Sequence, residues 1–97
     1  MSNPDQLLEK LYATIASLDS AEEAKQFLND LCTPQELSDM ADRWRVVPLL
    51  KEGIAYREIA KQTGVSVTTI GRVARSLNHG EGGYELMFNR LEQHHRH

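Results

Sequence analysis

The chain has 97 residues, of which 40% are hydrophobic and 26% are charged, and its formal net charge is −3. This length suits one domain with one small core, and the single Cys32 excludes a disulfide within the monomer. No apolar run reaches the roughly 20 residues that span a membrane, and the first residues lack the pattern of a secretory signal. We therefore expect a cytoplasmic protein with no membrane partner.

The first two helices are predicted from apolar residues at three- and four-residue spacing. The first helix carries its apolar residues from Leu7 to Leu18, and the second begins at Ala21. Ser20 immediately precedes the second helix, and Glu23 lies in its first turn. This is the spacing of a capping box, in which each side chain binds a free backbone amide.

A longer third helix is predicted from a stronger start signal. Thr33 is the expected N-cap, Pro34 takes the first helical position, and Glu36 closes a second capping box. Pro48 falls inside the apolar pattern, where it removes one backbone hydrogen bond. Because the pattern resumes after Pro48, we expect a kinked continuation that stops at Gly53.

Two short helices, 56–62 and 67–77, are predicted next, separated by a turn at 63–65 and a cap at Ser66. A glycine-rich connector, 78–83, then leads to a last amphipathic helix from Tyr84. No stretch alternates as a strand does, so the sequence predicts an all-α chain of six helices.

The segment 56–77 fits the helix-turn-helix pattern. Ala60 is small where the two helices cross, and Gly64 suits the left-handed turn. Apolar residues for a shared core stand at Ile59, Val65, Ile70 and Val73, with Ala74 and Leu77 extending the inner face. The alternative is an ordinary pair of helices whose glycine turn is coincidental.

Charge and the outward residues of this segment favour DNA as the partner. Residues 1–42 carry a net charge of −7, residues 43–79 carry +5, and the remainder carries −1. A basic segment of this kind is typical of a polyanion-binding face, although a solvated surface gives the same count. Small, hydroxylic and basic side chains suit entry into a major groove. The candidate DNA-binding residues are Arg57, Lys61, Ser66, Val67, Thr68, Gly71, Arg72 and Arg75.

These residues together resemble the Trp repressor superfamily. The matching segments are 31–37, 43–47, 49–53, 57–59, 64–72 and 76–77. Trp44 between two arginines, the Gly71–Arg72 pair and the glycine-rich connector are more similar to its YerC/YecD branch. The resemblance implies a single six-helix domain that forms an intertwined homodimer. Residues 1–53 would supply dimerisation helices, 54–78 the helix-turn-helix, and 79–97 the connector and C-terminal helix.

The resemblance also implies a candidate effector slot. In tryptophan-binding members two arginines sandwich the indole ring, and Arg43 and Arg72 stand at those positions. The hydroxyl-bearing slot positions, one of them supplied by the partner subunit, match Thr33, Thr69 and Ser76. Val73 replaces a glycine that the flat ring approaches, so we expect no strong tryptophan binding. The protein could instead bind a different effector or none. The alternative roles of the two arginines are phosphate contacts or surface ion pairs.

The sequence therefore predicts a transcriptional regulator, acting as a repressor, that binds a palindromic operator in double-stranded DNA as a homodimer. We expect no cofactor, no metal site and no enzymatic activity, because no nucleophile, base and oxyanion hole assemble. The alternative is a helical protein-interaction module that has lost DNA binding. The net charge of −3 for the whole chain favours the alternative, whereas the net charge of +5 in residues 43–79 favours the regulator.

Overall fold

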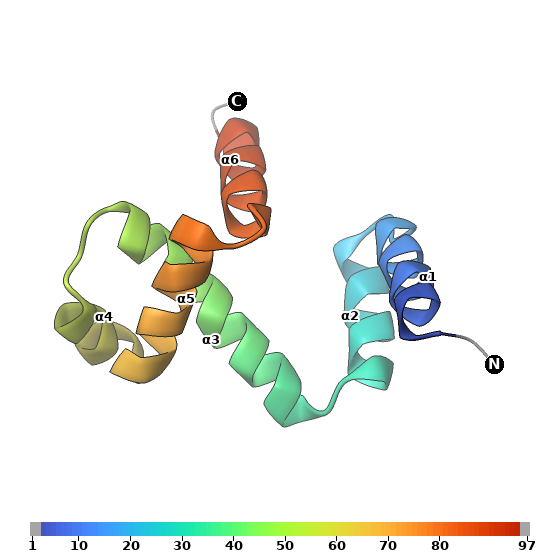
Figure 1. The fold of residues 1–97 in the computed structure, drawn as a ribbon, viewed down its shortest axis with the longest axis horizontal. Coiled ribbons are helices and arrows are strands. Elements are labelled where there is room, and N and C mark those ends of the chain that lie inside the picture. Colours follow the sequence, from blue (N-terminus) through green and yellow to red (C-terminus); the bar gives the residue numbers. More distant parts are fainter. Residues whose placement is uncertain (1–2, 96–97) are drawn as a thin grey trace. The chain divides into compact units, whose positions relative to one another are not determined.

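A computed structural model of the chain describes the backbone of residues 3–95 and the side chains of residues 3–93. Within that range it contains six helices and no strand, which confirms the all-α prediction (Figure 1). The helices are α1 (Pro4–Ala16), α2 (Ala21–Leu31), α3 (Pro34–Lys51), α4 (Tyr56–Thr63), α5 (Val67–His79) and α6 (Gly83–His95). None of the helices in the described part has the length and apolarity needed to cross a membrane.

The helices belong to two compact units. The first unit ends at Leu37 and contains α1 and α2, whereas the second begins at Ser38 and contains α4, α5, α6 and most of α3. The predicted division of one domain into segments 1–53, 54–78 and 79–97 stays a prediction.

Side-chain caps define the starts of the two helices in the first unit. The side chain of Asn3 accepts hydrogen bonds from the amides of Asp5 and Gln6, and that of Ser20 accepts one from the amide of Glu23 at 3.1 Å. The carboxylate of Glu23 in turn accepts from the amide of Asp19 at 2.9 Å, one residue before the donor expected of a capping box. No residue of α1 or α2 is buried. Of the predicted apolar stripe, Leu11 and Leu18 are half-buried, whereas the other members stay exposed: Leu7, Leu8, Tyr12 and Ile15.

Helix α3 begins as predicted and continues past Pro48, and the predicted kink at Pro48 stays a prediction. The amide of Glu36 donates to Thr33 Oγ1 at 3.1 Å, and the amide of Thr33 donates to Glu36 Oε1 at 2.8 Å. The helix runs on through Pro48 to Lys51. It stops because Gly53 takes a positive φ of 79°, a backbone conformation that favours glycine.

The core lies in the second unit, where α3, α4 and α5 meet. Its buried residues are Val46 and Val47 from α3, Ile59 from α4, Val65 from the turn, and Ile70, Val73 and Ala74 from α5. Each valine or isoleucine of this cluster contributes roughly 1.5–3 kcal/mol by leaving water. The cluster therefore sets how α5 sits on α3 and α4.

Helix α6 joins this core at its edge. Tyr84 and Phe88 pack against the buried cluster, and the ring of Tyr84 stacks on Trp44 of α3 with centroids 6.2 Å apart. Trp44 is thus a packing residue at the edge of the core. The predicted connector 78–83 is too long, because α5 extends to His79 and α6 begins at Gly83.

Candidate nucleic-acid interface

The turn between α4 and α5 is closed by local hydrogen bonds. Gly64 has a φ of 77°, and its amide donates to the carbonyl of Ala60 at 2.8 Å. The hydroxyl of Thr63 donates to the carbonyl of Ile59 at 2.7 Å and accepts from the amide of Val65 at 3.1 Å. The predicted role of Gly64 is confirmed, and Thr63 is a turn-closing residue that the sequence pattern did not single out.

The inner faces of α4 and α5 are those that the sequence predicts. Ile59, Val65, Ile70 and Val73 are buried between 0% and 6% exposure. Ala60 and Leu77 are half-buried and pack against the same cluster. Because these residues fix the rotation of α5 about its axis, they decide which side chains face outward.

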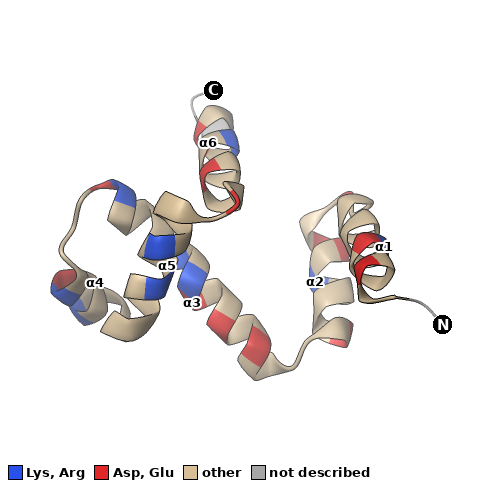
Figure 2. Cartoon of the chain, in the orientation of Figure 1, with Lys and Arg blue, Asp and Glu red and all other residues tan. Residues whose placement is uncertain are grey.

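The outward residues form one basic and hydroxylic surface on α4 and α5. All the candidate DNA-binding residues are exposed except Gly71, which is half-buried: Arg57, Lys61, Ser66, Val67, Thr68, Arg72 and Arg75. On α5, the spacing of Thr68, Gly71 and Arg75 places them in one row along the helix. Figure 2 shows that lysine and arginine gather on α4, α5 and the adjoining part of α3, whereas α1, α2 and the start of α3 carry acidic residues.

Arg45 of α3 adds a contact to this surface that the sequence pattern did not reveal. Its Nη1 donates to the carbonyl of Thr63 at 3.3 Å and lies 4.0 Å from Asp42 Oδ1. Half of its side chain stays exposed, so its charge is available to solvent beside the turn. A residue 18 positions away in the sequence therefore braces the turn between α4 and α5.

The candidate effector-slot residues have different surroundings. Arg43 is half-buried on α3, and Arg72 is exposed on α5. Thr69 accepts a hydrogen bond from the hydroxyl of Ser66 at 3.0 Å, within the cap of α5. Val73 lies in the buried cluster with 1% exposure. Thr33, a further candidate, belongs to the first unit, where it caps α3.

Ser76, another of these residues, borders a sizeable open cavity. The cavity has a volume of about 560 Å³, within the range of small-molecule sites. Its lining residues are Trp44, Ser76, Gly80, Glu81, Gly83, Tyr84 and Met87. The assignment of an effector slot and the prediction that Val73 obstructs tryptophan stay predictions.

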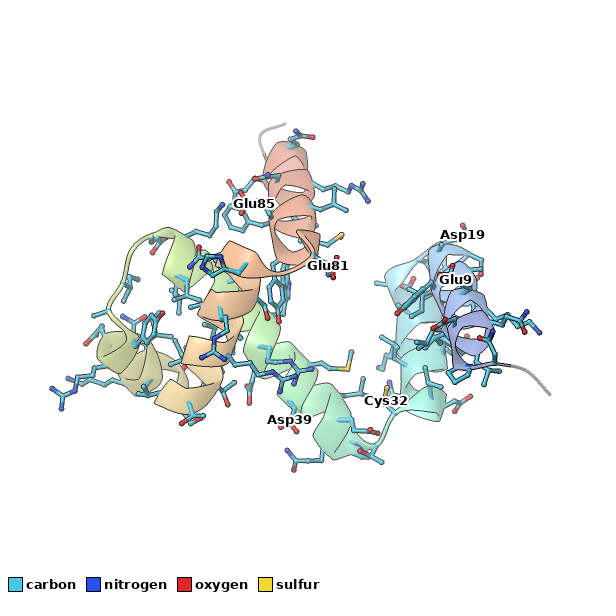
Figure 3. The ribbon with its side chains drawn as sticks, in the orientation of Figure 1. Glu9, Asp19, Cys32, Asp39, Glu81 and Glu85 are labelled. Carbon is cyan, nitrogen blue, oxygen red and sulfur yellow. The ribbon has the colours of Figure 1, made fainter. Side chains whose placement is uncertain are left out.

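An ion pair ties α6 to the end of α3. Lys51 Nζ lies 2.5 Å from Glu85 Oε1 and 5.1 Å from the centre of the Phe88 ring. Figure 3 labels Glu85 on α6. The hydrogen bond from Lys51 lowers the pKa of Glu85 below its ordinary value, with smaller contributions from the charge of Lys51 and from Asn89. The ionised form of Glu85 therefore adds a contact between α6 and α3 to the packing of Tyr84 and Phe88.

Known proteins share this architecture. The profile of a family described as Trp repressor protein matches residues 6–92. The uncharacterized protein YerC of Bacillus subtilis is 41% identical over 86 residues, which cover 89% of this chain and 83% of that protein. A Trp operon repressor homolog of Xylella fastidiosa is 35% identical over 74 residues, which cover 75% of this chain and 80% of that protein. The crystal structure of a TrpR-like protein from Eubacterium eligens is 42% identical, covers 90% of each chain, and superposes with a TM-score of 0.84.

Proposed function

Because the chain belongs to the Trp repressor family, a regulatory DNA-binding family and not an enzymatic one, we propose that it is a sequence-specific transcriptional repressor. The observation that carries this proposal is the division of α5 into two faces. Ile70, Val73 and Ala74 are buried, whereas Thr68 and Arg75 are exposed. A helix held in this way presents a fixed set of side chains to a partner.

In the proposed complex, α5 enters the major groove of duplex DNA. Thr68 and Arg75 then face base edges, where arginine can make paired hydrogen bonds to guanine. Arg57 and Lys61 of α4 lie exposed beside α5 and bind backbone phosphates, which position the helix without reading sequence. Arg72 serves either this surface or the effector slot.

We propose that the repressor acts as a homodimer on a palindromic operator. Large apolar side chains are exposed in both units, among them Leu7 and Leu8 of α1 and Leu86 and Leu91 of α6. Association of two chains would remove such surface from water. A two-fold dimer would present two copies of α5 to half-sites about 34 Å apart, one turn of DNA.

A salt titration of DNA binding tests the proposal. Duplexes are selected from a random-sequence pool by the wild-type protein, and affinity is then measured against salt concentration. Each phosphate contact adds about 0.9 to the slope of log affinity against log salt, because bound counterions are released. Arg57→Ala and Lys61→Ala should each reduce the slope by about 1. Lys25→Ala on α2, in the acidic first unit, is the matched control and should leave the slope unchanged.

The alternative function is a protein-interaction module without DNA binding, and the net charge of −3 favours it. This alternative predicts no selection of duplexes from the pool and no salt-dependent binding at low salt. Such a result would refute the proposed repressor function.

A further inference from the structure

Tyr56, the first residue of α4, lies beside the outward row of α5. If Gly71 carried a Cβ atom, that atom would lie 4.0 Å from Cε2 of Tyr56, which is an ordinary van der Waals distance. Apart from its two chain neighbours and the adjoining helix backbone, no other described atom comes within 4 Å of that point. The edge of the Tyr56 ring therefore borders the space in which a side chain at position 71 would begin.

This space belongs to the candidate DNA-binding surface. Gly71 lies between Thr68 and Arg75 in the outward row of α5, and both of these neighbours are exposed. Tyr56 itself is 42% exposed. Because Cε2 is bonded to the carbon that carries the hydroxyl, the hydroxyl lies at the same edge of the ring. The contact therefore places a phenol beside the residues that would face DNA.

The phenol has a hydrogen-bonding group that the protein does not use. Within the described part of the chain, no hydrogen bond is formed by the Tyr56 hydroxyl. One side of the residue also borders a hollow of about 340 Å³, which Leu50, Ile54 and Leu77 help to line. The ring thus lies near α5 at an exposed edge, and its hydroxyl is free to bind an external acceptor.

We propose that Tyr56 is a further DNA-contact residue, whose hydroxyl donates a hydrogen bond to a backbone phosphate oxygen at the edge of the groove entered by α5. Tyrosine is among the side chains that bind phosphate oxygens in protein–DNA complexes. The ring of Tyr56 lies near α5 at Gly71, so its hydroxyl is positioned beside the outward row of that helix. This inference rests on the proposed DNA-binding function.

A neutral donor has a signature that separates it from the basic residues. It strengthens binding without releasing a counterion, so its removal lowers affinity and leaves the salt slope unchanged. A donor to phosphate also does not distinguish one base from another. Its removal therefore weakens binding equally to the selected duplex and to single-base-pair variants of that duplex. Arg57→Ala differs, because it should lower the slope.

The test compares Tyr56→Phe with wild type in the full chain, using the selected duplex. The substitution removes only the hydroxyl, so the ring keeps its place beside α5 and the melting temperature should not change. Affinity should fall about tenfold, which is typical for one hydrogen bond to a charged group. Tyr12→Phe makes the same chemical change at an exposed position of α1 and should bind as wild type does.

The outcomes distinguish this inference from the proposed function. Wild-type affinity in Tyr56→Phe, together with salt-dependent binding by the wild-type protein, overturns the Tyr56 contact alone. A changed base preference in Tyr56→Phe also overturns it, because a phosphate contact reads no sequence. Absence of DNA binding by the wild-type protein overturns both proposals.

Discussion

Two substitutions on α5, Ile70→Ala and Arg75→Ala, should have opposite effects on stability and DNA binding. Ile70 is fully buried where α3, α4 and α5 meet. Its truncation leaves a cavity and should lower the free energy of unfolding by about 2–5 kcal/mol. In a domain of this size each kcal/mol corresponds to about 4–8 °C, so the melting temperature should fall by at least about 8 °C.

Arg75 lies five positions further along α5 and is exposed, with no ion pair or hydrogen bond in the described part of the chain. Its truncation should change the free energy of unfolding by no more than about 0.5 kcal/mol. Loss of a paired contact to a base costs about 1–3 kcal/mol of binding, which is roughly a 5- to 150-fold loss of affinity. Arg75→Ala should therefore melt as wild type does and bind the selected duplex weakly.

Thermal denaturation followed by circular dichroism measures the melting temperature of each variant. All samples have the same protein concentration, because association shifts the midpoint. Fluorescence anisotropy with the selected duplex measures the affinity for DNA, at a temperature where both variants are folded. Folded Ile70→Ala should retain most of its affinity. If Arg75→Ala instead melts early and binds DNA normally, the assignment of the outward face of α5 is wrong.

Three further predictions concern association, effector and pH. The unfolding midpoint should rise with protein concentration, because two chains would cover the apolar side chains exposed on α1 and α6; a constant midpoint with a monomeric mass in sedimentation contradicts this. Calorimetry should detect no strong binding of L-tryptophan, because Val73 occupies the position of the slot glycine; micromolar binding by the wild-type protein contradicts it. The Lys51–Glu85 contact should stabilise α6 fully above pH 4.5, the ordinary pKa of Glu85, and weaken as pH falls through the lowered pKa. Trp44 stacks on Tyr84 of α6, so its fluorescence should change in this acid transition in the wild-type protein. The Glu85→Gln variant should show no such change. An identical transition in both proteins excludes the ion pair as its cause.

The start and end signals of the helices were predictable from the sequence because they are local. The capping box of Thr33 and Glu36 and the cap at Ser66 bring together groups within three residues of one another. The positive φ at Gly53 and Gly64 follows from the absence of a side chain. The inner face of α4 and α5 was predictable for a similar reason, because helical periodicity alone selects one side of each helix.

Other features depend on how the helices pack. Lys51 and Glu85 are 34 positions apart, and Arg45 reaches a turn on a different pair of helices. Tyr56 lies near Gly71 because α4 packs against α5. Val73 stands at a slot position by resemblance, yet its side chain lies in the core. Periodicity shows which face of a helix is apolar, but the partner of each side chain is set by crossing angles and by the fit of the core between helices.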